Sequence, residues 1–174
     1  LENLWILAAD ENIDVIVISE SWYNENVLNN HVNIPGYNEP YRCDRQDGYG
    51  GVAIYASTKL NVRRCEPFEM GTVDNVCTKI EMIKHSVYVL GLYRPTKVSN
   101  PLFTAFINDF EEKVQNILSI ISPTDVLIIA GDLNVHCNSW YVNPRASKTF
   151  GTQLVQVLDS LGLEQVLDCP NYFR

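Results

Sequence analysis

The stretch IIAGDLNVHCNSW, from Ile128 to Trp140, sets apolar residues directly before a polar run that contains Asp132 and Asn134. With the residues before it, this stretch gives DVLIIAG at 125–131, a short continuous apolar run of the kind that forms a buried strand. Asp132 and Asn134 lie two residues apart where this strand ends. Because alternate residues of a strand point to the same side, we expect both side chains to face one cleft.

The rest of the chain switches between apolar runs or alternations of strand type and apolar residues at helical spacing. Several strands come first, and helices then alternate with apolar strands. This order predicts an α/β fold, a layered domain whose sheets are covered by helices. The predicted strands are 14–20, 51–56, 61–66, 76–83, 86–93 and 125–131, and the predicted helices are 1–8, 103–121 and 150–161.

Length and composition set further limits. With 174 residues, 46% of them hydrophobic, the chain can bury a sizeable core as one domain. No apolar run approaches the roughly 20 residues of a membrane-spanning helix, so we expect a soluble protein. The 5 cysteines are scattered without a CxxC pair, which favours a reducing compartment. His136 and Cys137 are adjacent, and adjacent residues seldom chelate one zinc ion.

The formal net charge of −8 at pH 7 argues against a protein that holds nucleic acid by charge alone. Two short basic clusters occur, one with Arg42 and Arg45 and one with Arg63 and Arg64. Clusters of this length are more typical of a solvated surface than of a phosphate-binding site.

Polar side chains end three of the predicted strands. Glu20 ends the first, Tyr93 ends the fifth, and Asp132 with Asn134 follows the sixth. Such convergence at one edge of a layered sheet indicates a binding site. Mg²⁺ prefers carboxylate oxygens, and Glu20 and Asp132 would suffice to hold it together with a substrate phosphate. Asn134 can donate a hydrogen bond to a phosphate oxygen, and the Tyr93 hydroxyl can stabilise developing charge.

Each of these residues also has a purely structural explanation. Glu20 is compatible with a solvated strand end, since carboxylates are common there. Asp132 and Asn134 are compatible with an Asx turn, because both side chains bond their own backbone readily. Tyr93 is compatible with a core position that leaves its hydroxyl at the rim.

Four motifs that follow one another along the chain favour the functional explanation of these residues over the structural one. They are SESW at 19–22, GYGGVAIY at 48–55, LYRP at 92–95 and GDLNVHCNSW at 131–140. In order and approximate spacing the chain resembles the endonuclease/exonuclease/phosphatase superfamily, whose fold is a layered α/β sandwich. The segment DRQDGYGGVAIY and Trp140 make it most similar to the endonuclease domain of jockey-type non-LTR retrotransposons, which precedes a reverse transcriptase in the same polyprotein.

The resemblance implies a role for each residue. Glu20 matches the metal-binding glutamate, with Mg²⁺ or Mn²⁺ as cofactor. Tyr93 matches the tyrosine that contacts the scissile phosphate, Asp132 the aspartate that helps orient the attacking water, and Asn134 its phosphate-contacting partner. The implied function is a metal-dependent, DNA-nicking endonuclease. Its expected partners are DNA and the reverse transcriptase domain of the same polyprotein, without a membrane, and its expected location is intracellular and nuclear.

The chain also departs from the family pattern. Relatives carry an Asn on a first strand before the initial helix, and a Ser-Asp-His motif near the C-terminus whose histidine activates water. His31, His85 and His136 are the only histidines, and none lies in that context. We therefore expect 1–174 to be a single domain truncated at both ends, lacking the first strand and the C-terminal strands. Loss of the histidine removes general-base help of about 10²- to 10⁴-fold, so we expect this fragment to be inactive.

Two other functions remain open. A fold does not fix a substrate, so another phosphoesterase, acting on an inositol phosphate or on sphingomyelin, fits the same pattern. A non-catalytic binding module is the other alternative, which the missing histidine and the acidic balance favour.

Overall fold

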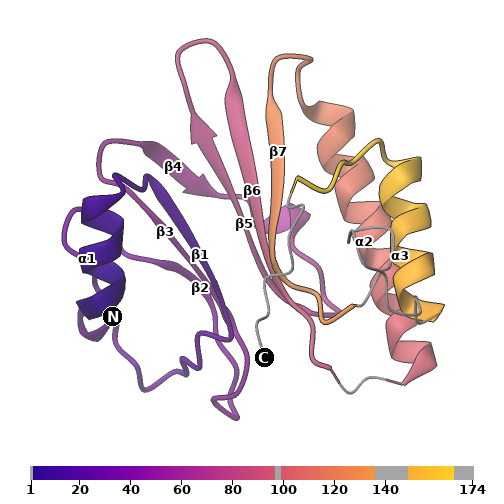
Figure 1. Cartoon of the computed structure of the whole chain (residues 1–174), viewed down its shortest axis with the longest axis horizontal. Helices are drawn as coiled ribbons and strands as arrows, with labels where there is room; N and C mark the ends of the chain where they lie inside the picture. Colours follow the sequence, from indigo (N-terminus) through magenta and orange to yellow (C-terminus); the bar gives the residue numbers. More distant parts are fainter. Residues whose placement is uncertain (1, 97–98, 136–148, 167–174) are drawn as a thin grey trace.

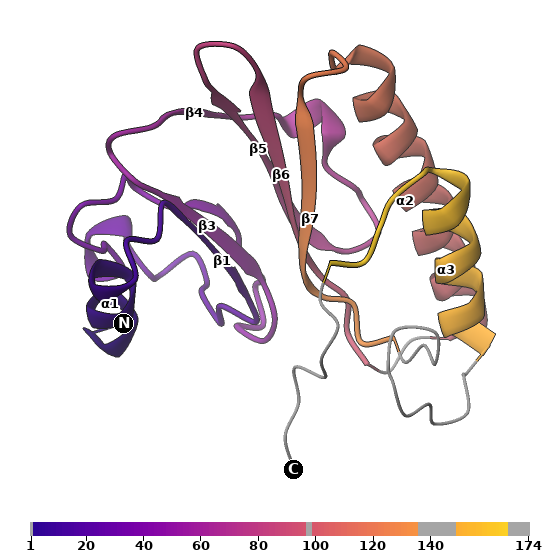
Figure 2. The same ribbon diagram turned by 45° about the horizontal axis from the view of Figure 1, so that its top comes forward.

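The computed structural model describes residues 2–96, 99–135 and 149–166. Two β-sheets pack face to face, and helices cover their outer faces (Figure 1). The helix α1 (Glu2–Asp10) lies on one outer side, and α2 (Asn100–Ile120) and α3 (Thr149–Ser160) lie together on the other. The turned view in Figure 2 shows the same layers, so the predicted α/β layered sandwich is confirmed.

The sheet next to α1 has three antiparallel strands in the order β1-β3-β2. They are β1 (Val15–Ser19), β2 (Tyr41–Cys43) and β3 (Val52–Ala56). Every residue of β3 is buried, because alternate side chains face the two neighbouring layers. Ala53 and Tyr55 pack against the α1 side with Ala8, whereas Val52 and Ile54 face the second sheet.

The second sheet has the order β4-β5-β6-β7. Its strands are β4 (Asn61–Arg64), β5 (Asp74–Glu81), β6 (Ser86–Tyr93) and β7 (Val126–Asp132). β4, β5 and β6 are antiparallel neighbours, whereas β6 and β7 run parallel, as the connection through α2 requires. The short 3₁₀ helices Asn29–His31 (η1) and Glu66–Phe68 (η2) lie in connections.

The outer face of the second sheet packs on α2 and α3. Phe103, Phe106 and Phe110 are fully buried there against Leu90 and Leu92 of β6. These phenylalanines recur at three- and four-residue spacing, which places them on one face of α2 and explains the buried stripe.

The space between the two sheets is filled by an inter-sheet core. This core consists of Val52, Ile54, Val76, Ile80, Val89 and Tyr93. At Gly91 of β6 the sheets approach so closely that a Cβ would lie 3.0 Å from Val17 and 3.1 Å from Val52. Tyr93 is the last residue of β6, and it is 8% exposed. The inter-sheet core therefore ends at Tyr93.

All predicted helices and strands occur, with two differences. The strand β2 was not predicted, because its three half-buried residues sit in a polar loop and pair only with β3 among the described strands. The prediction that β7 is buried is wrong. Val126 and Ile128 are 44% and 46% exposed, since β7 is the last strand of the described sheet and has a strand neighbour on one side only.

The surface interpretation of the two basic clusters is also wrong for two of their arginines. Arg42 is half-buried and paired with Asp44, and Arg64 is half-buried and bonded to Glu69 through two nitrogens at 2.8 Å each. Both therefore serve the local structure. In the part of the chain that the structure describes, no helix has the length and apolar character to cross a membrane.

Candidate active site

Three polar side chains stand in one row at the end of the four-stranded sheet. Asp74 of β5 is the register partner of Tyr93, and Tyr93 is the register partner of Asp132 of β7. Cross-strand neighbours project from the same face, and Tyr93 belongs to the inter-sheet core. The three side chains therefore lie where the space between the sheets opens.

Glu20 reaches this row from the other sheet. It follows β1, and the Tyr93 hydroxyl donates a hydrogen bond of 2.6 Å to its Oε1. The backbone of Glu20 is left-handed, with φ of 56°. This conformation costs a non-glycine residue about 1 to 3 kcal/mol and persists only where the surroundings impose it. The structure thus brings Glu20 and Tyr93 together across the two sheets, as expected for residues of one site.

Two glycines of the GYGG motif impose the left-handed conformation of Glu20. The N–H of Ser21 donates to the carbonyl of Gly51 at 3.3 Å, and the N–H of Trp22 donates to the carbonyl of Gly50 at 2.9 Å. The pairing of β1 with β3 places SESW beside GYGGVAIY. The two motifs are therefore parts of one structural unit.

Gly50 also contacts the Tyr93 ring. Its φ is 93°, and a Cβ at this position would lie 2.8 Å from Tyr93 Cε1 and 2.9 Å from Asp74 Oδ2. The same Asp74 oxygen accepts a hydrogen bond of 2.9 Å from the N–H of Gly51. Glycine is thus required on both conformational and steric grounds. Asp74 was not predicted as part of the site, although it begins a strand that alternates clearly.

Arg94, the residue after Tyr93, was also missed. It is 1% exposed, and its guanidinium donates to the carbonyls of Leu133 at 2.6 Å, Asn134 at 2.6 Å and Pro95 at 2.9 Å. Burial lowers the pKa of Arg94, whereas the charge of Asp132 raises it. Through its bonds to Leu133 and Asn134, Arg94 therefore holds the loop that follows β7 in place. The LYRP motif was the signal for it in the sequence.

Within this loop, Asp132 and Asn134 are joined by an Asx turn. The N–H of Asn134 donates to Asp132 Oδ1 at 2.8 Å, and Asn134 Nδ2 donates to the carbonyl of Arg94 at 2.8 Å. The expectation that strand alternation relates the two residues is wrong, because β7 ends at Asp132 and Asn134 has φ of 49°. The turn still keeps the exposed Asp132 carboxylate against the backbone of Asn134.

The surroundings of Tyr93 shift its pKa. Burial is the main cause that raises the pKa of Tyr93 to about 12, followed by the hydrogen bond to Glu20 and the charges of Glu20 and Asp132, with Arg45 opposing. The hydroxyl is therefore protonated at neutral pH and available as a hydrogen-bond donor.

The donor set fits a hard divalent cation. Glu20 and Asp132 present exposed carboxylates on the two sides of Tyr93. Within residues 2–96, 99–135 and 149–166, no three His, Cys, Asp or Glu side chains lie close enough to hold a metal together. Mg²⁺ commonly uses only one or two carboxylates along with substrate phosphate, so a sparse site of this kind suits Mg²⁺ or Mn²⁺.

Other predicted elements lie elsewhere. His31 is in η1, and His85 is in the connection between β5 and β6, at the opposite end of β6 from Tyr93. His136, Cys137 and Trp140 lie outside the described residues.

Comparison with known proteins identifies the family of the chain. The model of the endonuclease/exonuclease/phosphatase family matches residues 2–171, so the chain belongs to that family, whose members are metal-dependent phosphodiesterases and nucleases. No curated protein matches the sequence.

Solved structures with the same fold are only distantly similar in sequence. The endonuclease domain of TRAS1, a telomere-specific non-LTR retrotransposon, superposes with a TM-score of 0.70 at 20% identity, over 98% of this chain and 69% of that one. The 3′ phosphatase NExo from Neisseria, bound to a product DNA hairpin, gives 0.62 at 15% identity over 92% and 65%. D. rerio TDP2 with a single-strand DNA product gives 0.54 at 12% over 95% and 58%. The chain thus spans less than two thirds of the last two proteins.

Proposed function

We propose that this chain is part of a divalent-metal-dependent endonuclease that nicks DNA for a non-LTR retrotransposon. The observation that supports it is the hydrogen bond of 2.6 Å between Tyr93 and Glu20 across the two sheets, with Asp132 in register beside Tyr93. In this proposal a reverse transcriptase follows in the same polyprotein, and the enzyme acts in the nucleus.

Glu20 is the proposed ligand for Mg²⁺ or Mn²⁺. Its Oε1 accepts the Tyr93 hydrogen bond, and the exposed carboxylate has a second oxygen for a cation. When bound, the cation supplies positive charge next to the substrate phosphate, where negative charge develops. The left-handed backbone of Glu20, held by the glycine segment, fixes the direction of this carboxylate.

The other residues act on the phosphate and on water. The Tyr93 hydroxyl, whose pKa is raised to about 12, keeps its single proton, which it donates to Glu20 in this structure. With substrate bound, the hydroxyl donates this hydrogen bond to a phosphate oxygen instead of to Glu20. Asp132 accepts a hydrogen bond from the attacking water and orients it. The side-chain amide of Asn134 donates one hydrogen to the Arg94 carbonyl, and its second hydrogen is proposed to be donated to the phosphate.

DNA is the proposed substrate for two reasons. The four ordered motifs match retrotransposon endonucleases, and two proteins of the same fold, NExo and TDP2, were solved with DNA products. An inositol phosphate or a sphingomyelin head group has no comparable support among the structures described above.

The test uses a polypeptide that contains all of residues 1–174. We expect Mn²⁺ binding, measured by calorimetry, to weaken in Glu20→Gln, because a sparse site loses a main ligand. Glu25→Gln is the matched control, since Glu25 is an exposed glutamate of the same loop. Nicking of supercoiled plasmid should require the metal and should fall in Glu20→Gln alone. Equal Mn²⁺ affinity in both variants would overturn the metal assignment, and cleavage of a phosphorylated head group instead of plasmid would overturn the DNA assignment.

A further inference from the structure

Two aromatic side chains stand out from the surface beside the candidate site. Trp22 is 60% exposed and Tyr49 is 70% exposed. Their ring centroids lie 6.3 Å apart with an interplanar angle of 66°, an edge-to-face contact. Trp22 and Tyr49 together are called the aromatic lip below. Tyrosine and tryptophan are enriched at interfaces because they combine a large apolar ring with a polar group, so this exposed pair is suited to contact a binding partner.

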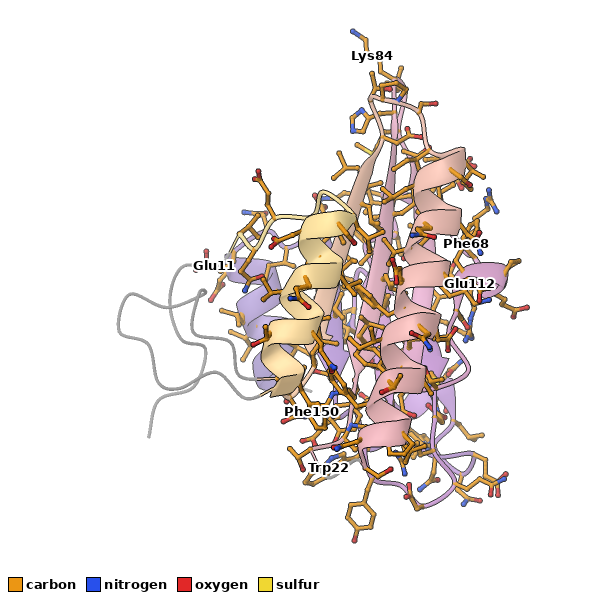
Figure 3. All side chains as sticks on the ribbon, turned by 90° about the vertical axis from the view of Figure 1, so that its right-hand side faces the viewer. Glu11, Trp22, Phe68, Lys84, Glu112 and Phe150 are labelled. Carbon is orange, nitrogen blue, oxygen red and sulfur yellow. The ribbon has the colours of Figure 1, made fainter. Side chains whose placement is uncertain are left out.

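The aromatic lip is attached directly to the site residues. Trp22 lies two residues after Glu20, and its N–H donates to the carbonyl of Gly50 at 2.9 Å. Tyr49 precedes Gly50, the glycine that packs on the Tyr93 ring. Figure 3 shows Trp22 at the opposite end of the molecule from Lys84, which lies between β5 and β6. That is the end at which β6 reaches Tyr93.

The backbone of the aromatic lip is held in place. Trp22 has a left-handed φ of 57°, a conformation that bulky residues rarely adopt. The N–H of Tyr49 donates to Asp47 Oδ1 at 3.1 Å, and Arg45 binds both oxygens of Asp47 at 3.1 and 2.9 Å. Strained conformations that the surroundings impose cluster at functional sites. Here the strain turns Glu20 toward Tyr93 and leaves Trp22 in solvent.

We propose that the aromatic lip stacks on an unpaired DNA base next to the phosphate held at Glu20 and Tyr93. This inference rests on the proposed function and names the form of its substrate, a duplex with a nucleotide out of the stack. The net charge of −8 limits what phosphate contacts can contribute, whereas stacking on an aromatic ring needs no charge. The edge-to-face pair offers one ring face to the base and a second ring at its edge.

The experiment measures binding without hydrolysis, in EDTA, by fluorescence anisotropy. One probe is a labelled short duplex with a single unpaired adenine at its centre, and the other is the same duplex fully paired. We expect the parent protein to prefer the unpaired probe. Trp22→Ala should weaken its binding by about 5- to 150-fold, the range of stacking energies per base, and Trp22→Phe should retain most of it.

Trp5→Ala is the matched control, because Trp5 is another exposed tryptophan, 41% exposed, on the distant α1. It should leave both affinities unchanged, and equal thermal midpoints of the variants would exclude unfolding as the cause. Equal affinity of parent and Trp22→Ala for the unpaired probe would overturn the stacking proposal alone. Absence of binding to both probes in EDTA would also overturn the stacking proposal, whereas the proposed DNA function is tested separately by metal-dependent plasmid nicking.

Discussion

Substitution of Gly50 by alanine tests how the site is built. The added Cβ would lie 2.8 Å from Tyr93 Cε1, 2.9 Å from Arg45 Cδ and 2.9 Å from Asp74 Oδ2. Cβ contacts below 3.0 Å essentially never occur, so the Tyr93 ring or the glycine segment has to move. Either movement lengthens the hydrogen bond of 2.6 Å between Tyr93 and Glu20, because the loop that carries Glu20 is bonded to the glycine segment through Ser21 and Trp22.

The size of the effect follows from two contributions. Alanine at a positive φ costs about 1 to 2 kcal/mol. Overpacking costs about 1 to 3 kcal/mol more, so Gly50→Ala should lose about 2 to 5 kcal/mol of unfolding free energy. Gly36→Ala separates the two contributions. Gly36 has φ of 86° and nothing within 4 Å of its Cβ position, so it should lose only the backbone part.

Urea unfolding of both variants measures these losses. Spectrophotometric titration of the tyrosines adds a local readout, because the raised pKa of Tyr93 depends on its burial and on Glu20. We expect that pKa to fall toward 10 in Gly50→Ala and to stay in Gly36→Ala. Equal destabilisation of the two variants with an unchanged tyrosine titration would refute the packing of Gly50 on Tyr93.

Two further predictions concern the residues around that contact. The pKa of Tyr93 is raised from 10.0 to about 12, so the stability that its protonated hydroxyl contributes is complete below pH 10 and is lost as the pH rises through 12. Urea unfolding across this pH window should therefore show a smaller loss of unfolding free energy in Tyr93→Phe than in the parent protein. Arg94→Met leaves the carbonyls of Leu133 and Asn134 without their hydrogen-bond donor, and should lower the unfolding free energy by about 1 to 3 kcal/mol per carbonyl that stays buried. An unchanged denaturation midpoint would show that Arg94 does not hold the loop after β7 in place.

Much of the fold was predictable because both sheets are covered on two faces. The apolar runs of β3 and β6 reflect this burial, and the spacing of Phe103, Phe106 and Phe110 marks the buried face of α2. The strand β2 was not predictable in this way. It has three residues, and only its pairing with β3 makes it a strand.

The site was predictable only in part. Glu20, Tyr93 and Asp132 could be proposed from strand ends and motifs, but their proximity depends on how two sheets pack. Asp74 was missed because its place beside Tyr93 is set by strand register, which no local pattern encodes. The prediction for Asn134 was wrong because a single residue with a positive φ of 49° leaves no periodic pattern in the sequence.

The central claim is that the Asp132–Asn134 turn beside Tyr93 acts on the reacting phosphate. Plasmid nicking by alanine variants of these two turn residues tests it most directly. The measurement compares kcat and thermal midpoint in a polypeptide containing residues 1–174, with Asp159→Ala as control because Asp159 is an exposed aspartate of α3. We predict that Asp132→Ala and Asn134→Ala lose most of kcat while both variants stay folded and unfold cooperatively, with midpoints somewhat below that of the control because the bonds of the turn are lost. Full metal-dependent nicking by either turn variant would contradict the assignment of this site.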